Sequence, residues 1–160
     1  MIKIPLTQNQ IALISDEDFD LIRVYKWYAV YDKRRNKFTA VVARVGKNTI
    51  YMHRLIMKNV LQNKLHIDHI DLNPLNNQRN NLRLATDSQN QANTLSRKNS
   101  SSIYKGVTKR KHGKFQVEIR INRKSKHLGM FDNEEDAAKE YDKAAKLAFG
   151  EFANLNFKEK

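Results

Sequence analysis

Apolar and polar residues alternate strictly from Phe115 to Ile121, which is the clearest pattern in the chain. A period of two predicts a strand with one buried face and one polar face. Shorter runs over 104–110 and 124–131 flank this strand, with turn residues at His112-Gly113 and Asn122-Arg123 between them. The pattern therefore predicts three antiparallel strands that share one open polar face.

A helix is predicted to begin at Asn133, directly after this sheet. Asn133 is a favourable N-cap, and acidic residues at 134–136 suit the positive end of the helix dipole, with Asp136 placed for a capping box. Gly150 marks the expected end of the helix. A face of small residues would allow close approach to the sheet and consists of Ala137, Ala138, Tyr141, Ala144, Ala145 and Ala148. This segment is expected to form a β-β-β-α unit.

The N-terminal third shows a weaker pattern of short β runs with one short helix. Residues 2–4, 38–45 and 49–52 are predicted strands, and the last two flank a glycine turn typical of a hairpin. Acidic residues at 16–18 precede a predicted helix. A small core is expected around Trp27, Tyr28 and Phe38.

Positive charge is concentrated in one block of the chain. The 160 residues include 30 Lys and Arg against 17 Asp and Glu, a formal net charge of +13. From Thr94 to Phe131 there are 11 basic residues and one acidic residue, Glu118, whereas 132–160 carry a net charge of −3. A basic block followed by an acidic helix favours a nucleic-acid-binding face. A solvated lysine-rich surface is the alternative.

Several classes of protein are excluded by composition. The absence of cysteine excludes disulfides, thiolate zinc sites and cysteine nucleophiles. No window approaches the apolar length of a membrane span, and the first residues lack the apolar stretch of a signal peptide. We therefore expect a cytoplasmic protein that does not bind membranes.

Residues 66–93 are dense in side chains that support hydrolysis. Asp68-His69 is expected to end one strand, 82–85 to form a second, and a capped helix to follow with Asn90 and Asn93 on one face. Hydrolysis of a phosphodiester needs an activated water and a cation on the phosphate oxygens. Asp and Asn oxygens suit Mg²⁺ or Mn²⁺, and an imidazole can act as general base near neutral pH.

The Asp68-His69 pair poses a geometric difficulty. Adjacent strand residues point to opposite faces, so these two side chains need a bulge or a twist to share one site. An ordinary surface Asp-His pair is the alternative when the two residues are taken alone.

Three motifs together resemble the HNH homing endonuclease family in its His-Asn-Asn form: Asp68-His69-x-Asp71, Asn81-Leu82-Arg83 and Gln89-Asn90-x-x-Asn93. The resemblance covers residues 53–93 and implies a ββα-metal fold with a bent first strand. It implies that His69 is the general base and that Asn81 holds the loop and orients His69 by hydrogen bonding. It also implies that Asp68 and Asn90 bind one divalent cation.

Neighbouring residues are expected to have structural roles. His66 could be a second metal ligand, but the resemblance assigns it no role, and His53 is expected to start a helix that packs against the motif. Asn93 is expected to buttress the helix and Asp71 to close the turn, while Arg83 could contact phosphate or pair with Asp71. Structural zinc is not expected, because without cysteine four ligands would have to come from scattered His and Asp residues.

A second series of motifs lies near the C-terminus. Tyr104-Lys105-Gly106-Val107, Glu118-Ile119-Arg120 and Leu155-Asn156-Phe157 resemble the plant Apetala-type, ethylene-response-factor DNA-binding domain. The resemblance spans residues 104–157 and implies a three-stranded sheet that lies in the major groove. By position it implies that the DNA-facing residues are Lys105, Thr108, Arg110, His112, Glu118, Arg120, Ser125 and His127.

The departures from the plant pattern bear on selectivity. Thr108 and Ser125 replace arginines, His112 and His127 replace tryptophans, and Lys105 lacks the bidentate fork of arginine. The sheet is therefore expected to bind DNA with reduced or altered base selectivity. A basic sheet that serves another partner is the alternative.

The expected fold is α+β: a β-rich scaffold (1–52), a ββα-metal HNH nuclease module (53–93), a basic Ser-rich linker (94–103), and a three-stranded antiparallel sheet packed on one helix (104–157). The expected function is a metal-dependent, site-directed DNA endonuclease, homing-endonuclease-like, that nicks duplex DNA as a monomer with one Mg²⁺ or Mn²⁺. A bacterial or phage-infected cell is its expected setting. A DNA-binding transcriptional regulator with an inactive HNH module is the alternative.

Overall fold

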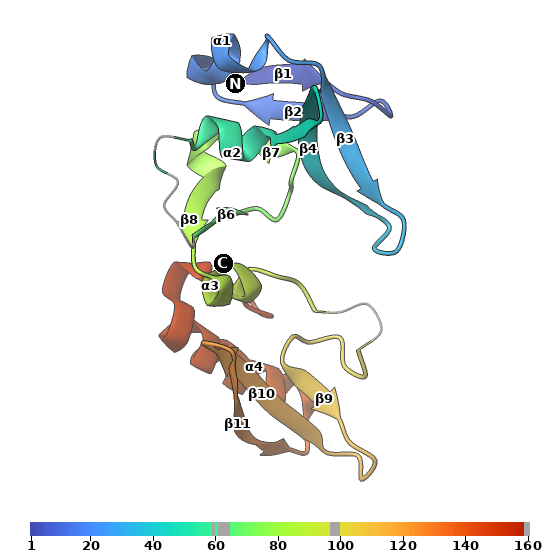
Figure 1. The fold of residues 1–160 in the computed structure, drawn as a ribbon. Helices are drawn as coiled ribbons and strands as arrows, with labels where there is room; N and C mark the ends of the chain where they lie inside the picture. The colour runs from blue at the N-terminus through green and yellow to red at the C-terminus, as the bar shows by residue number, and fades with distance from the viewer. Residues whose placement is uncertain (59, 61–64, 97–99, 159–160) are drawn as a thin grey trace. The chain divides into compact units, whose positions relative to one another are not determined.

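The computed structural model describes residues 1–58, 60, 65–96 and 100–158, which form two compact units, Met1–Ala85 and Thr86–Lys160. The position of one unit relative to the other is not determined, so each unit is described by itself (Figure 1). Residues 97–99 of the predicted linker lie outside the described part of the chain. In that described part, no helix has the length and apolar character needed to cross a membrane.

Unit 1 is an assembly of small sheets and short helices. Its strands are β1 (Ile2–Pro5), β2 (Ile11–Ile14), β3 (Trp27–Asp32), β4 (Lys37–Val45), β5 (Asn48–Tyr51), β6 (His66–His69), β7 (Asn76–Asn77) and β8 (Leu82–Ala85). Its helical elements are η1 (Asp16–Asp18), α1 (Phe19–Ile22), α2 (Met52–Ile56) and η2 (Arg79–Asn81). The three sheets have the orders β1-β2-β7, β3-β4-β5 and β6-β8.

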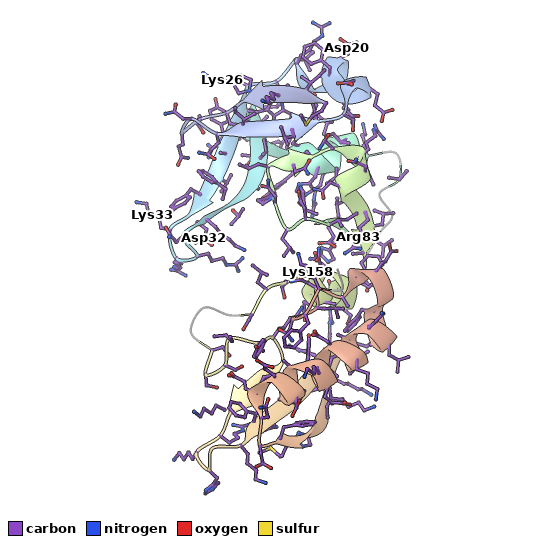
Figure 2. All side chains as sticks on the ribbon, turned by 180° about the vertical axis from the view of Figure 1, so that it is seen from behind. Asp20, Lys26, Asp32, Lys33, Arg83 and Lys158 are labelled. Carbon is purple, nitrogen blue, oxygen red and sulfur yellow. The ribbon has the colours of Figure 1, made fainter. Side chains whose placement is uncertain are left out.

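Several predicted elements of unit 1 are confirmed. The hairpin of β4 and β5 turns at Gly46, where φ is +58°, and the side chains of Asp32 and Lys33 lie at the tip of the β3–β4 hairpin (Figure 2). The acidic residues at 16–18 form the 3-10 turn η1 before α1. Asn76-Asn77 forms the short strand β7, which pairs in parallel with β2.

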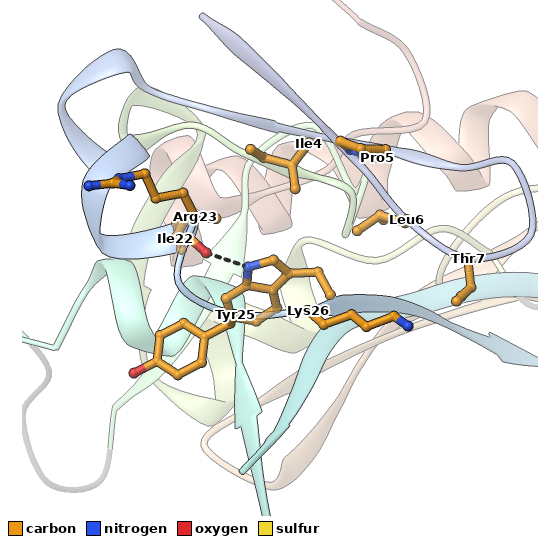
Figure 3. Close-up of a pocket in the computed structure, with 9 residues that line it drawn as sticks. Ile4, Pro5, Leu6, Thr7, Ile22, Arg23, Tyr25 and Lys26 are labelled. Carbon is orange, nitrogen blue, oxygen red and sulfur yellow. Dashed lines mark hydrogen bonds between the residues drawn. The ribbon is translucent and has the colours of Figure 1, made fainter.

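The core of unit 1 is larger than the predicted one. Trp27 is buried in it, and its indole Nε1 donates a hydrogen bond of 2.9 Å to the Ile22 carbonyl (Figure 3). Tyr28 and Phe38 are only half-buried, so the prediction that they share this core is wrong. The buried cluster consists of Ala12, Ile14, Ile22, Trp27, Val41, Ala43, Met52, Ile56 and Leu82. It joins β2, α1, β3, β4, α2 and β8.

Unit 2 contains the predicted β-β-β-α unit. Its elements are α3 (Asp87–Ala92), β9 (Val107–Lys109), β10 (Phe115–Ile121), β11 (Lys124–Phe131), α4 (Glu134–Phe149) and η3 (Gly150–Phe152). The antiparallel sheet has the order β11-β10-β9. Val117 and Ile119 are buried against α4 while Glu118 and Arg120 are exposed, which confirms the predicted alternation.

Helix α4 confirms most of the predicted signals. Asn133 Oδ1 accepts hydrogen bonds from the backbone N–H groups of Glu135 and Asp136, at 2.8 and 3.1 Å. The Asp136 carboxylate forms an ion pair with Lys139 rather than the expected capping box. Ala148 is exposed and does not belong to the buried face, which instead includes Asp142. The helix ends where Gly150 adopts a φ of +54°.

The compact units divide the chain at Ala85 and Thr86, inside the segment that resembles an HNH module. Helix α3, the expected last element of that module, therefore belongs to unit 2. Its N-terminus is capped as the sequence suggests: Thr86 Oγ1 accepts from the Gln89 N–H, and the Gln89 side chain accepts from the Thr86 N–H, completing a capping box.

Candidate active site and nucleic-acid interface

His69 occupies the last position of β6, and its imidazole is fixed by Asn77 of β7. His69 Nε2 lies 3.3 Å from Asn77 Oδ1, while Asn77 Nδ2 donates to the Pro74 carbonyl at 3.2 Å. The second bond orients the Asn77 amide so that its oxygen faces His69. An oxygen acceptor requires the proton on Nε2, which places the imidazole lone pair on Nδ1. The sequence does not single out Asn77 for this role.

A second histidine packs on His69. The rings of His53, in α2, and His69 are 5.3 Å apart between centroids and nearly perpendicular. Burial lowers the pKa of His53 to about 4, with smaller contributions from His69 and Arg54. Burial also lowers the pKa of His69, although Asn77 and nearby carboxylates oppose this. His53 therefore packs against the motif as predicted, and both imidazoles are neutral at pH 7.

The buried His53 should make folding stability depend on pH. The unfolded chain binds a proton at this residue below about pH 6.5, whereas the folded protein does so only near pH 4. Stability should therefore fall by about 2 kcal/mol from pH 7 to pH 4.5. His69 acts in the same direction, so urea unfolding of His53→Gln, which removes one of the two groups, should show a smaller fall. Equal pH dependence in wild type and His53→Gln would contradict the assignment.

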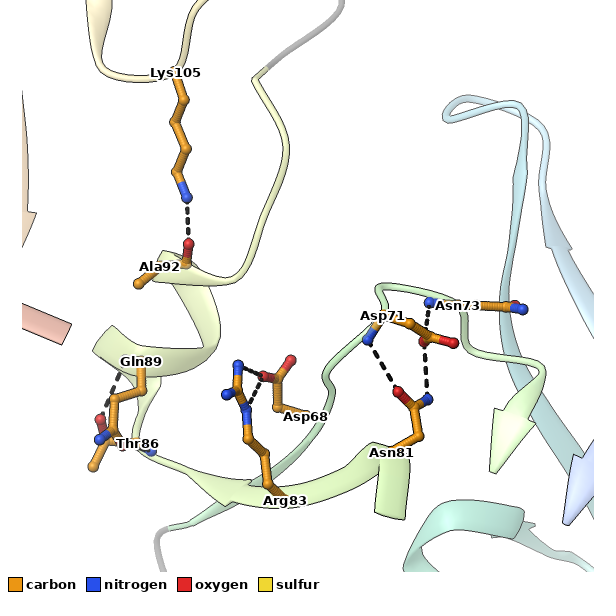
Figure 4. A network of polar contacts seen from close by, with 9 residues as sticks. All are labelled: Asp68, Asp71, Asn73, Asn81, Arg83, Thr86, Gln89, Ala92 and Lys105. Atoms are coloured by element: carbon orange, nitrogen blue, oxygen red, sulfur yellow. Dashed lines mark hydrogen bonds and ion pairs between the residues drawn. The ribbon is translucent and has the colours of Figure 1, made fainter. Parts of the chain in front are cut away.

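Asn81 holds the loop that follows His69 (Figure 4). Its Oδ1 accepts from the Asp71 N–H at 3.0 Å, and its Nδ2 donates to Asp71 Oδ1 at 2.9 Å and to the Asn76 carbonyl at 2.8 Å. The Asn81 carbonyl accepts from the N–H of Ile70, the residue after His69. Asp71 closes the turn as predicted, because its Oδ1 also accepts from the Asn73 N–H. Asn81 thus fixes the backbone beside His69, while the amide that contacts the imidazole belongs to Asn77.

Asp68 and His69 lie in different surroundings. Asp68 is 4% exposed and faces Arg83 of β8, whose Nε and terminal nitrogen both lie 3.0 Å from Asp68 Oδ2 (Figure 4). Arg83 thus pairs with Asp68, not with Asp71. β6 and β8 pair without a register shift, with Asp68 opposite Arg83 and His69 opposite Leu82. The strand pairing therefore contains no bulge between Asp68 and His69.

Asn90 lies on α3 in unit 2, so the structure does not relate it to Asp68. A carboxylate and an amide are both hard oxygen donors suited to Mg²⁺, which commonly takes one or two protein ligands and completes its shell with water and substrate phosphates. Among the described residues, no group of three His, Cys, Asp or Glu could hold a metal ion. His66 is exposed on β6.

Most residues predicted to face DNA share the open face of the β9–β11 sheet. Glu118 stands opposite His127, and Arg120 stands opposite Ser125, on paired strands. Thr108 lies opposite Gln116 on the next strand. All five predicted residues on these strands are exposed, and so are Arg110 and His112 in the β9–β10 turn. Lys105 differs, because it is half-buried and its Nζ donates to the Ala92 carbonyl of α3 (Figure 4).

Gln116 links side chains on this face and was not singled out from the sequence. Its Oε1 accepts from Arg110 Nε at 2.6 Å, and its Nε2 donates to Glu118 Oε1 at 2.5 Å. His127 Nδ1 lies 3.4 Å from the same Nε2. The alternation of the strand placed Gln116 on the polar face. The cross-strand bonds depend on register, which the sequence pattern does not fix.

An apolar hollow of about 460 Å³ in unit 1 is separate from the residues described above (Figure 3). Trp27 and Ile22 form part of its wall, and Arg23 and Lys26 also line it. None of the predicted catalytic or metal-binding residues lines it.

The chain is similar to known HNH endonucleases. The HNH endonuclease family model matches residues 50–92. An uncharacterized HNH endonuclease of Acanthamoeba polyphaga mimivirus is 33% identical over 147 residues, which cover 91% of this chain and 74% of that protein.

Two Arabidopsis thaliana proteins also match part of the chain. An AP2/ERF and B3 domain-containing transcription repressor is 42% identical over 72 residues, 45% of this chain and 20% of that protein. Dehydration-responsive element-binding protein 2D is 43% identical over 63 residues, 38% of this chain and 31% of that protein. The matched segments span less than a third of each plant protein.

Proposed function

Because the chain belongs to the HNH endonuclease family, we propose that it is a metal-dependent endonuclease that hydrolyses phosphodiester bonds in duplex DNA. One candidate base per chain favours nicking of a single strand by a monomer. The sheet of unit 2 supplies most of the affinity and the register, as in a site-directed, homing-endonuclease-like enzyme.

One observation carries this proposal: His69 is held as a neutral imidazole of defined tautomer. Asn77 Oδ1 accepts a hydrogen bond from His69 Nε2–H, burial lowers the pKa of His69, and Asn81 fixes the backbone that follows His69. A neutral imidazole with its lone pair on Nδ1 is a competent general base at pH 7.

In the proposed reaction, His69 Nδ1 accepts a proton from the attacking water. The water oxygen forms a bond to phosphorus while the bond from phosphorus to the leaving oxygen breaks. Asp68 and Asn90 would bind the divalent cation through their side-chain oxygens. The bound cation would stabilise negative charge on the phosphate and on the leaving oxygen. Arg83 holds the Asp68 carboxylate in place.

The open face of β9–β11 would bind DNA through the residues it exposes. Arg120 and Arg110 suit phosphate or guanine, and Glu118 suits cytosine. The names of the two plant relatives support this proposal, since one is a transcription repressor and the other an element-binding protein. Affinity should fall with salt, because phosphate contacts release counterions.

Metal removal tests the proposal. Incubation of wild-type protein with supercoiled plasmid and Mg²⁺ should produce the nicked circle on an agarose gel. EDTA should abolish nicking, because the phosphate charge is then not neutralised, and excess Mg²⁺ should restore it. If the plasmid stays intact with both Mg²⁺ and Mn²⁺ while the protein still shifts duplex DNA, the protein is a DNA-binding regulator with an inactive nuclease module. Nicking that persists in EDTA would contradict the metal requirement.

A further inference from the structure

Helix α3 carries Asn90, and its N-terminal end is tied to the β10–β11 turn within unit 2. Ser88 Oγ accepts a hydrogen bond of 2.8 Å from the Asn122 N–H. The Asp87 carboxylate lies 2.7 Å from the Arg123 guanidinium. Asn122 and Arg123 both have positive φ, which is typical of a tight hairpin turn of fixed geometry. The turn that joins β10 and β11, two strands that carry most of the residues predicted to face DNA, thus also holds the start of α3.

The C-terminal end of α3 is tied to two other segments of unit 2. The Ala92 carbonyl accepts hydrogen bonds from Lys105 Nζ and from the Asn154 N–H, the latter at 3.1 Å. Asn154 Nδ2 donates to the Thr94 carbonyl at 3.2 Å. Ala92 and Asn93 are 5% and 6% exposed, so the end of the helix is enclosed. An ammonium at this position also interacts favourably with the helix dipole.

Lys105 is itself held by a partly buried polar network. Its backbone N–H donates to Asn156 Oδ1 at 2.7 Å, and its carbonyl accepts from Asn156 Nδ2 at 3.2 Å. Asp142 Oδ1 accepts from the N–H and the Nδ2 of Asn156, at 2.8 and 2.9 Å. Burial lowers the pKa of Lys105 to about 8, against the opposing effect of Asp142. A lysine fixed at its backbone and its ammonium is unlike an exposed lysine that reaches for phosphate.

We propose that Lys105 is a positioning residue of the nuclease rather than a DNA contact: it fixes the end of α3, and unit 2 thereby sets where Asn90 is presented. This inference rests on the proposed function, in which Asn90 is a metal ligand. It assigns unit 2 two roles, because the sheet that binds DNA and the contacts that hold α3 belong to the same compact body. DNA bound to the sheet would therefore be fixed relative to the helix that carries Asn90.

The two roles of Lys105 predict opposite kinetic signatures. In Lys105→Met, we expect the single-turnover nicking rate at saturating protein to fall at least about tenfold, because small misplacements of a functional group are costly in rate. The Kd for duplex DNA and its salt dependence should stay at wild-type values. Lys105→Arg, which keeps a cation, should recover most of the rate. Lys143→Met, at an exposed lysine of α4, should match wild type in rate and Kd.

A phosphate contact would give the reverse result. If Lys105→Met raises the Kd and reduces the salt slope by about one, while the rate at saturation is kept, Lys105 touches DNA and the proposal fails. Arg120→Gln, on the open face, provides the reference for that behaviour, with a raised Kd and a smaller salt slope.

Hydrogen exchange gives a measurement that does not depend on nuclease activity. The N–H groups of Asn90 and Asn93 donate within α3 to the carbonyls of Thr86 and Gln89. In Lys105→Met these amides should exchange faster than in wild type and Lys143→Met, while β10 amides stay protected. If the α3 amides exchange at the wild-type rate in Lys105→Met, Lys105 does not hold the end of α3 and the proposal fails. A different outcome would reject the proposed function alone. In that case the wild-type protein fails to nick DNA, but the α3 amides of Lys105→Met still exchange faster than those of wild type.

Discussion

Replacing His69 with alanine is expected to lower the rate of plasmid nicking by about 10²- to 10⁴-fold, the usual contribution of a general base. Alanine removes the only atom in the proposed reaction that accepts the proton of the attacking water. The rate should be measured under single-turnover conditions with Mg²⁺ and saturating protein. Binding to duplex DNA should change little, because the proposed function assigns the binding surface to unit 2.

His66→Ala is the matched control, since it makes the same substitution on the same strand at an exposed position without a proposed role. It should nick at nearly the wild-type rate. If His66→Ala loses as much activity as His69→Ala, damage to β6 rather than loss of a base explains the result. If His69→Ala keeps the wild-type rate, another group activates the water.

The second large effect is expected from Gly106→Ala, which should destabilise unit 2 by about 3 kcal/mol or more. Gly106 has a φ of +78°, and a Cβ there would lie 1.9 Å from a ring carbon of Tyr141, which is buried in α4. Backbone strain contributes about 1–2 kcal/mol and overpacking about 1–3 kcal/mol. Urea unfolding should show the loss of stability, and the variant should lose affinity for duplex DNA when unit 2 unfolds.

Gly113→Ala separates the two contributions. Its φ is +82°, but no atom lies within 4 Å of an added Cβ, so only backbone strain remains. It should cost about 1 kcal/mol and leave DNA binding intact at moderate temperature. Equal losses at both glycines would mean that the Tyr141 contact adds nothing.

Local signals in the sequence predicted the local structure well. The period-two pattern correctly predicted β10, with Val117 and Ile119 buried, and Asn133 caps α4 as expected. The strand pattern and the helix cap each depend on residues that are close in sequence. Asp71 closes its turn for the same reason. Ala148 is exposed while Phe149 packs against the buried cluster, so the buried face follows the i+4 position after Ala145.

Contacts between distant segments were not predictable in this way. Asn77 meets His69 because β7 pairs with β2, more than sixty positions earlier in the chain. The resemblance to the plant domain predicts that Lys105 faces DNA. Its side chain instead contacts α3, because Asn156, near the other end of unit 2, fixes the Lys105 backbone. The division of the chain at Ala85 likewise follows from packing rather than from the motif.

The placement of α3 in unit 2 has a consequence for synthesis on the ribosome. Translation delivers β6 and β8 first, so a growing chain already contains His69 when the residues that anchor α3 have not yet been made. Asn154 is among the last of these anchors. Until Asn154 is made, the contacts that hold the C-terminal end of α3 are incomplete. Translation would thus complete the β9–β11 sheet before the last contacts that hold α3 are made.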